Sequence, residues 1–154
     1  MAGRDRSLYY SSSLFTITTM TLHYKTFSDG GARGNPGPAA YGAAVYLPDG
    51  TRLALKKYIG HGTNNQAEYR GLIAALECLV SHNAKHAECY LDSELLVKQM
   101  RREYRVKDAE LGKLFLEAWS HASRIPHIAF HHIPRAQNKE ADALVNEALD
   151  ESGH

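Results

Sequence analysis

The stretch SDGGARGNPGPAAYG, residues 28–42, joins two runs of strand-forming residues and places a carboxylate, Asp29, ahead of a glycine-rich turn. Glycine and proline favour a tight reversal of the chain here, so the strands on either side are expected to be antiparallel neighbours. Asp29 ends the first of these strands. It is either the polar end of the turn or one ligand of a metal site whose other ligands lie far along the chain.

Strand and helix patterns alternate along the chain without internal repeats. Three antiparallel strands are predicted within residues 22–29, 39–50 and 51–60, with a Pro-Asp-Gly turn between the second and the third. The helix that follows is predicted over 63–80, because Thr63 and Gln66 have capping-box spacing and the leucines repeat at helical intervals. The remaining predicted elements are a strand at 87–92, helices at 93–102 and 109–124, a strand at 127–133 and a helix at 138–151. This order predicts an α/β fold in which a mixed sheet carries helices on its faces.

The length and cysteine content favour one intracellular domain. The chain of 154 residues fits a single domain, expected at 21–151, that buries roughly 70% of the surface of its unfolded form. Its two cysteines lie in apolar runs and are expected to be core residues in a reducing compartment. No apolar run approaches the ~18 residues of a membrane span, and the N-terminus lacks the apolar centre of a signal peptide. We therefore expect a cytoplasmic monomer that binds no membrane.

Residues 1–20, MAGRDRSLYYSSSLFTITTM, fit no part of this pattern and are treated as an N-terminal extension. Three interpretations stay open for them: a disordered tail, an extra edge strand, or an upstream translation artefact with Met20 as the true start.

Charge is nearly balanced, with 18 Lys and Arg residues against 17 Asp and Glu residues, so no general field attracts nucleic acid to this protein. Any grip on phosphate must therefore be local. The one dense basic stretch, RREYRVK at 101–107, favours a solvated helix end.

Four carboxylates differ from the other acidic residues in their positions. Glu68 lies four and eight positions before two leucines of its predicted helix, so it falls on the core-facing stripe. Asp142 lies three and seven positions before apolar side chains of the last helix, again on an apolar side. Asp29 and Asp92 each end an apolar strand, where α/β sheets collect their ligands.

Each of these carboxylates also has an ordinary structural interpretation. The two aspartates at strand ends suit a turn cap and a helix cap, and helix N-terminal amides could satisfy the other two. If the four converge instead, carboxylates ~4 Å apart repel by about 4 kcal/mol at an effective dielectric near 20, so the pocket needs protons or cations. Oxygen ligands without a Cys or His partner favour Mg²⁺ or Mn²⁺, and two ions ~3.5–4 Å apart would serve both sides of a phosphodiester displacement.

The four carboxylates lie in the motifs DGGARGNPGP, TNNQAEY, LDSELLVKQM and NKEADALVNEAL. Over residues 22–150, their order, spacing and context resemble those of type 1 ribonuclease H, in a compact branch similar to archaeal members. The motifs are similar to the first aspartate with its glycine-rich turn, the helical glutamate, the second aspartate and the last aspartate of that family. The resemblance implies the ribonuclease H-like fold: a five-stranded mixed sheet, antiparallel in strands one to three and parallel in strands four and five, with helices on both faces.

The resemblance also implies a chemistry, the metal-dependent endonucleolytic cleavage of the RNA strand of RNA/DNA hybrids. Hydrolysis in one step would use two ions of Mg²⁺ or Mn²⁺ and leave 5′-phosphate and 3′-hydroxyl ends. Asp29 would bridge both ions. Glu68 and Asp92 would hold one ion, and Asp142 would help to hold the other. Positioning and charge neutralisation would supply most of the acceleration.

Selectivity for RNA requires contacts to a 2′-hydroxyl, which is both a donor and an acceptor. Asparagine suits that task because its amide carries donors and an acceptor, although turn and cap chemistry is the alternative for these asparagines. The substrate contacts implied by the resemblance, including a DNA phosphate at Thr63, come from Gly30, Arg33, Asn35, Thr63, Asn64, Asn65, Ser93, Glu94 and Asn138.

The sequence departs from the family pattern in several places. The loop before the last aspartate offers Arg135 where many members carry a mobile histidine, and a guanidinium is expected to contact phosphate without shuttling protons near neutral pH. Position 94 is glutamate rather than glutamine, which puts one ribose contact in doubt. We expect neither the basic handle nor the hybrid-binding domain of some relatives, so affinity should be modest and dependent on salt.

Two other classes stay open. A non-catalytic nucleic-acid-binding relative would lack a carboxylate, whereas all four are present. A polynucleotidyl transferase or junction nuclease would share the sheet and the acids but would not need the asparagine-rich turns at 35 and 64–65. His131 and His132 are expected to be structural, with one of the pair facing inward.

Overall fold

The computed structural model describes residues 22–154, and the predicted N-terminal extension lies outside them. The strands are β1 (Tyr24–Ala32), β2 (Gly37–Tyr46), β3 (Arg52–Gly62), β4 (His86–Leu91) and β5 (His127–His132). The helices are α2 (Asn64–Ser81), α3 (Glu94–Met100), α4 (Ala109–Ala122), the short 3₁₀ helix η1 (Arg135–Gln137) and α5 (Lys139–Glu151). None of the helices in this described part is long and apolar enough to cross a membrane.

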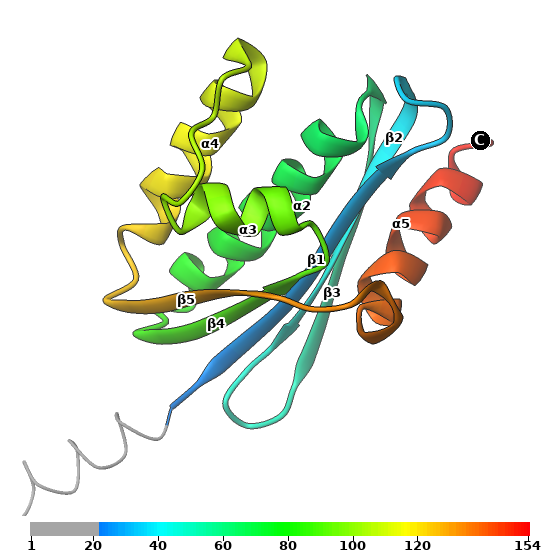
Figure 1. The fold of residues 1–154 in the computed structure, drawn as a ribbon. Coiled ribbons are helices and arrows are strands. Elements are labelled where there is room, and N and C mark those ends of the chain that lie inside the picture. Colours follow the sequence, from blue (N-terminus) through cyan, green and yellow to red (C-terminus); the bar gives the residue numbers. More distant parts are fainter. Residues whose placement is uncertain (1–21) are drawn as a thin grey trace, which may run out of the picture.

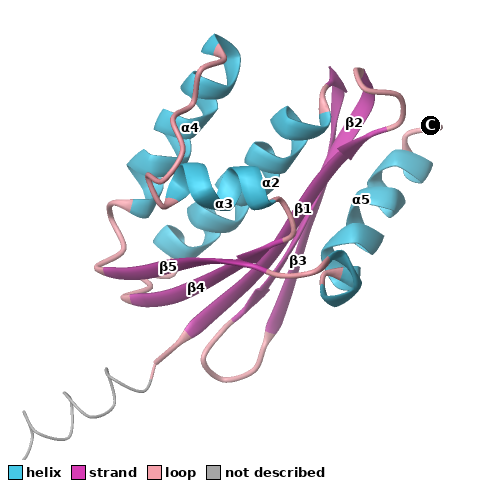
Figure 2. Ribbon diagram, in the orientation of Figure 1, coloured by secondary structure: helices cyan, strands magenta, loops and turns pink. Residues whose placement is uncertain are grey.

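The five strands form one mixed sheet in the order β3-β2-β1-β4-β5 (Figures 1 and 2). β2 is antiparallel to both β1 and β3, while β4 is parallel to β1 and to β5. Parallel pairing follows because α2, and later α3 with α4, return the chain to the same end of the sheet before the next strand begins. The predicted mixed sheet is confirmed.

Helices cover both faces of the sheet, with α2, α3 and α4 on one side and α5 on the other (Figure 1). Two glycines allow α2 and α5 to lie against the strands. A Cβ atom added at Gly30 would lie 2.1 Å from the backbone of Ala67 in α2, and one at Gly42 would lie 2.6 Å from the backbone of Ala141 in α5. Because Glu68 follows Ala67 and Asp142 follows Ala141, these close contacts also fix two of the predicted carboxylates against the sheet.

The main core lies between the sheet and α2, α3 and α4. Cys89 is buried in this core, as predicted, whereas Cys78 is only partly buried and packs against it; both are free thiols. A smaller cluster joins α5 to the other face through Val145, Ala148 and Leu149. The predicted capping box of α2 is present, since the Thr63 side chain accepts a hydrogen bond from the Gln66 amide and the Gln66 side chain accepts one from the Thr63 amide.

The predicted end of the first strand is wrong, because β1 does not end at Asp29. Its pairing with β2 continues to Ala32, and the reversal is made by residues 33–36. Backbone pairing with β2 therefore overrides the turn tendency of Gly30 and Gly31. The parallel pairing with β4, in contrast, stops at Ser28, so Asp29 lies where a neighbouring strand ends.

Candidate active site

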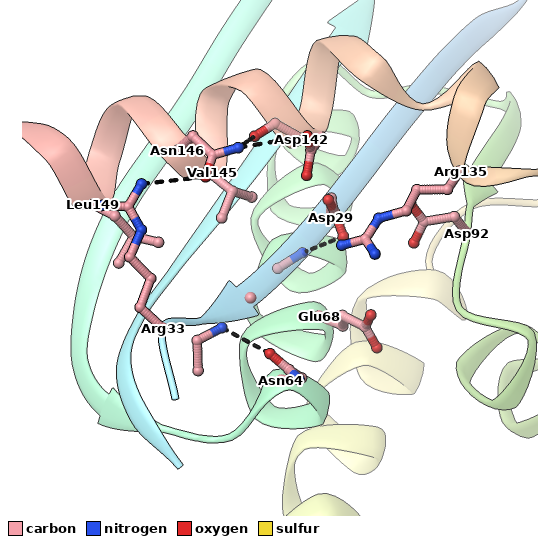
Figure 3. A pocket seen from close by; sticks show the side chains of 13 residues that line it. Asp29, Arg33, Asn64, Glu68, Asp92, Arg135, Asp142, Val145, Asn146 and Leu149 are labelled. Atoms are coloured by element: carbon pink, nitrogen blue, oxygen red, sulfur yellow. Dashed lines mark hydrogen bonds between the residues drawn. The ribbon is translucent and has the colours of Figure 1, made fainter. Parts of the chain in front are cut away.

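The four predicted carboxylates line one cavity of about 440 Å³ at the end of β4 (Figure 3). Three different elements and a strand end supply them: β1 supplies Asp29, α2 supplies Glu68, the residue after β4 is Asp92, and α5 supplies Asp142. The cavity is also lined by Arg135 from η1. The structure thus brings together side chains that are more than a hundred residues apart in sequence.

Asp29 is the most enclosed of the four carboxylates, with 6% of its surface exposed. Its Oδ1 accepts a hydrogen bond from the Gly30 amide at 2.8 Å. Asp29, Glu68 and Asp92 each offer an oxygen within 4.8 Å of the other two. Asp142 faces this trio from the α5 side of the cavity (Figure 3).

Burial and mutual repulsion make the cavity electrostatically unusual. Burial, reinforced by the charge of Asp92, raises the pKa of Asp29 to about 7. Burial also raises the pKa of Glu68 to about 7, although a hydrogen bond from Ser93 opposes the shift. One oxygen of Asp92, Oδ2, is buried without a hydrogen-bond partner. Converging carboxylates, one of them with an unpartnered oxygen, fit a hard divalent cation such as Mg²⁺ or Mn²⁺.

Arg135 projects into this acidic cavity from η1 (Figure 3). Its positive charge lowers the pKa of Glu68, but this effect is smaller than those of burial, the Ser93 hydrogen bond and the Asp92 charge. A guanidinium at this position stays charged at all physiological pH values, so it can bind an anion but cannot carry protons.

The turn after β1 and the start of α2 are held together by the predicted asparagines. The Asn64 side-chain oxygen Oδ1 accepts a hydrogen bond from the backbone N–H of Ala32 at 2.8 Å. The backbone N–H of Asn64 in turn donates to the side-chain oxygen Oδ1 of Asn35 at 3.0 Å. The side chain of Thr63 caps α2, while Asn65 is exposed beside it. These residues therefore form one fixed surface next to the cavity.

The other predicted substrate contacts have varied surroundings. Ser93 caps α3, and its neighbour Glu94 pairs with Lys98 at 2.9 Å. Arg33 lines the cavity and forms an ion pair with Asp150 at 2.8 Å. Gly30 lies within β1, where its missing side chain admits α2.

Asn138 is the clearest correction to the predicted contacts. It is 1% exposed, and its Nδ2 donates a hydrogen bond to the Ser28 carbonyl oxygen at 2.9 Å. An amide enclosed in this way cannot reach a nucleic acid on the surface. The expected substrate contact is thus replaced by an internal one.

The expectation that His131 or His132 faces inward is also wrong. His131 is half-buried, with its ring stacked on Tyr90 at 5.1 Å and its Nε2 3.4 Å from Glu88. His132 is exposed. β5 is the last strand of the sheet, so the core does not enclose its C-terminal end.

One cavity residue, Asn146, was missed by the sequence interpretation. It lies one helical turn after Asp142, and its Nδ2 donates to the Asp142 carbonyl oxygen at 3.1 Å. Its Oδ1 accepts from Arg33 at 3.3 Å, which connects α5 to the turn after β1. The spacing of four residues from Asp142 was the available signal.

Known proteins share this fold. Residues 27–148 match a family described as reverse transcriptase-like. The bifunctional protein Rv2228c of Mycobacterium tuberculosis is 46% identical over 125 residues, which cover 80% of this chain and 34% of that protein. Its N-terminal RNase H domain, solved as a fusion with maltose-binding protein, has a TM-score of 0.81 at 43% identity, covering 86% of this chain and 96% of that one.

Two further relatives are also ribonucleases H. Ribonuclease HI of Halobacterium salinarum is 41% identical over 127 residues, which cover 82% of this chain and 64% of that protein. LC11-RNase H1, isolated from compost and solved with an RNA/DNA hybrid, has a TM-score of 0.78 at 42% identity, covering 85% of this chain and 99% of that one. This chain therefore spans about a third of the mycobacterial protein and under two thirds of the archaeal one. By its sheet, its motif order and these matches, the chain belongs to the type 1 ribonuclease H family.

Proposed function

We propose that this protein is a metal-dependent endonuclease that hydrolyses the RNA strand of RNA/DNA hybrids. The observation that carries the proposal is the convergence of four carboxylates on one cavity, with the pKa values of two of them raised to about 7. Family membership supports the same reaction, and LC11-RNase H1 was solved with an RNA/DNA hybrid. A monomeric state and a cytoplasmic location are further parts of the proposal.

The carboxylates are the proposed metal ligands. Asp29 would contact two ions of Mg²⁺ or Mn²⁺, Glu68 and Asp92 would complete the site of one, and Asp142 would help to hold the other. Bound cations of this kind neutralise phosphate charge and make water a stronger nucleophile, which is the chemistry that phosphodiester hydrolysis needs. The enclosure of Asp29 limits the water around it and so strengthens its attraction for a cation.

The residues around the cavity would position the substrate. Arg135 would contact a phosphate oxygen, since its guanidinium faces the cavity and stays charged. Asn35 and Asn64 accept backbone hydrogen bonds through their Oδ1 atoms, and within the described chain their Nδ2 atoms have no partner. Both asparagines therefore offer fixed N–H donors that suit the 2′-hydroxyl of a ribose.

Labelled RNA/DNA, RNA/RNA and DNA/DNA duplexes, incubated with Mg²⁺, Mn²⁺ or chelator, test this function. We expect cleavage of the RNA strand of the hybrid with either metal, 5′-phosphate and 3′-hydroxyl products, and no cleavage with chelator. Preferential cleavage of DNA/DNA, or of branched DNA in an added assay, would instead favour a junction nuclease. Hybrid binding without any cleavage would favour a non-catalytic relative.

A further inference from the structure

We propose that Asn138 is a positioning residue that holds Asp29 and Asp142 at a fixed separation across the cavity. The inference rests on the proposed function, because it assigns these two carboxylates to one metal site. Asn138 precedes α5 and is buried, with no path for its side chain to contact substrate. Its role must therefore be exerted through neighbouring residues.

The side chain of Asn138 does not do what an asparagine usually does at this place in a helix. Asparagine before the first turn commonly accepts a hydrogen bond from an amide of that turn. Asn138 makes no such capping bond to α5. Its Nδ2 donates instead to the carbonyl oxygen of Ser28, 110 residues away in β1. The side chain of Asn138 therefore bonds to the central strand β1 and does not cap α5.

Asn138 contacts the backbone beside both carboxylates. Ser28, which accepts the bond from its side chain, directly precedes Asp29. The carbonyl oxygen of Asn138 accepts a hydrogen bond from the amide of Asp142 at 3.1 Å. One residue therefore links the strand that carries Asp29 to the helical turn that carries Asp142.

This link opposes a repulsion between the residues that it connects. Asp29 and Asp142 line the same cavity, so their carboxylate charges repel each other. The other side-chain bonds from α5 to the sheet, such as Tyr46 to Glu140 at 2.6 Å and Lys56 to Glu151 at 2.7 Å, are exposed and join residues that do not line the cavity. Among the described residues, the Asn138 bond is the buried side-chain hydrogen bond that ties α5 to β1.

The energetic cost of Asn138 also indicates a role in geometry rather than in stability alone. Its Oδ1 is buried without a hydrogen-bond partner, which disfavours burial of the amide. Residues that support a metal ligand from outside the coordination shell typically change metal affinity by about 10–100-fold when they are replaced. We expect replacement of Asn138 to weaken metal binding by a factor in this range.

The test compares Asn138→Ala with Tyr46→Phe, which also removes a bond to the first turn of α5, but one between residues that do not line the cavity. Mn²⁺ affinity is measured by calorimetry without substrate, and kcat and KM are measured on a hybrid. We expect Asn138→Ala to bind Mn²⁺ about tenfold more weakly or worse and to lose kcat with KM unchanged. Tyr46→Phe is expected to match the wild type in all three quantities.

Asn138→Asp provides a second test at the same side-chain size. An added negative charge would by itself strengthen cation binding, so weaker Mn²⁺ binding in this variant is attributable to the lost N–H donor. Unchanged Mn²⁺ affinity, or a higher KM with unchanged kcat, would overturn the proposal, as would failure of both variants to fold. Since Mn²⁺ binding needs no nucleic acid, an inactive wild-type protein would count against the proposed function and leave the role of Asn138 measurable.

Discussion

Asp29 and Asp92 each follow the last residue pair of the β1–β4 ladder, which joins Ser28 to Leu91. At this level β4 leaves the sheet, whereas β1 continues with β2 alone. The uncovered side of β1 thus opens into the cavity, with two carboxylates at its rim. Their proximity raises the pKa of Asp29 beyond the effect of burial, and four predictions test what this arrangement does.

The first prediction concerns stability and pH in the presence of chelator. The pKa values of Asp29 and Glu68 are about 7 in the folded protein, whereas unfolded carboxyl groups ionise near pH ~4. Because their pKa values are higher in the folded protein, protonated Asp29 and Glu68 favour the folded state. This contribution to stability is complete below about pH 4 and is lost as the pH rises through about 7. We expect Glu68→Gln to melt at nearly the wild-type temperature at pH 5 but roughly 4 °C higher at pH 8.

Thermal melts across this pH range, with chelator and again with excess Mg²⁺, make the measurement. Mg²⁺ should abolish the advantage of Glu68→Gln, because the cation relieves the same repulsion in the wild type. A difference in melting temperature that does not vary with pH would contradict the electrostatic explanation.

The second prediction separates Arg135 from the carboxylates. Arg135→Ala removes a proposed phosphate contact and should lower kcat by about tenfold, whereas Asp92→Asn removes a proposed metal ligand and should lower it by about a thousandfold. Steady-state cleavage of a labelled hybrid measures both, with Arg124→Ala, an exposed arginine outside the cavity, as the control. Equal losses in the two variants would mean that Arg135 takes a larger part in the reaction.

The third prediction concerns the close approach of α2 to β1. The Cβ atom of Gly30→Ala would lie 2.1 Å from the Ala67 backbone, so we expect a loss of about 3 kcal/mol or more in the free energy of unfolding. The control is Gly112→Ala in α4, where nothing lies within 4 Å of the added Cβ atom. There we expect the free energy of unfolding to rise by up to about 1 kcal/mol, because alanine favours a helix more than glycine does. Urea denaturation measures both, and a mild effect at Gly30 would show that α2 can move away from the strand.

Much of this fold and site could be predicted from local sequence patterns. The Thr63 and Gln66 pair predicted the start of α2 because a capping box depends only on residues three apart. Glu68 and Asp142 stood out because charges on apolar helix faces conflict with the local pattern, as functional residues often do. The cavity at the end of β4, which both side chains line, now explains both positions.

The remaining features depend on contacts between distant segments, which local patterns do not contain. The side-chain direction of Asn138 is set by Ser28, 110 residues away, so its position before a helix predicted neither its burial nor its partner. The true end of β1 was missed because pairing with β2 holds Gly30 and Gly31 extended. The exposure of His132 follows from the edge position of β5, which is fixed only when the strand order is known.

The most direct test of the central claim, that the carboxylate cavity drives metal-dependent cleavage, is the cleavage of a labelled RNA/DNA hybrid by Asp29→Asn. Asp49→Asn is the matched control, because it makes the same change of charge at an exposed turn outside the cavity. We expect Asp29→Asn to fold but to cleave about a thousandfold more slowly in Mg²⁺, with Asp49→Asn as active as the wild type. Cleavage by Asp29→Asn at the wild-type rate would contradict the account.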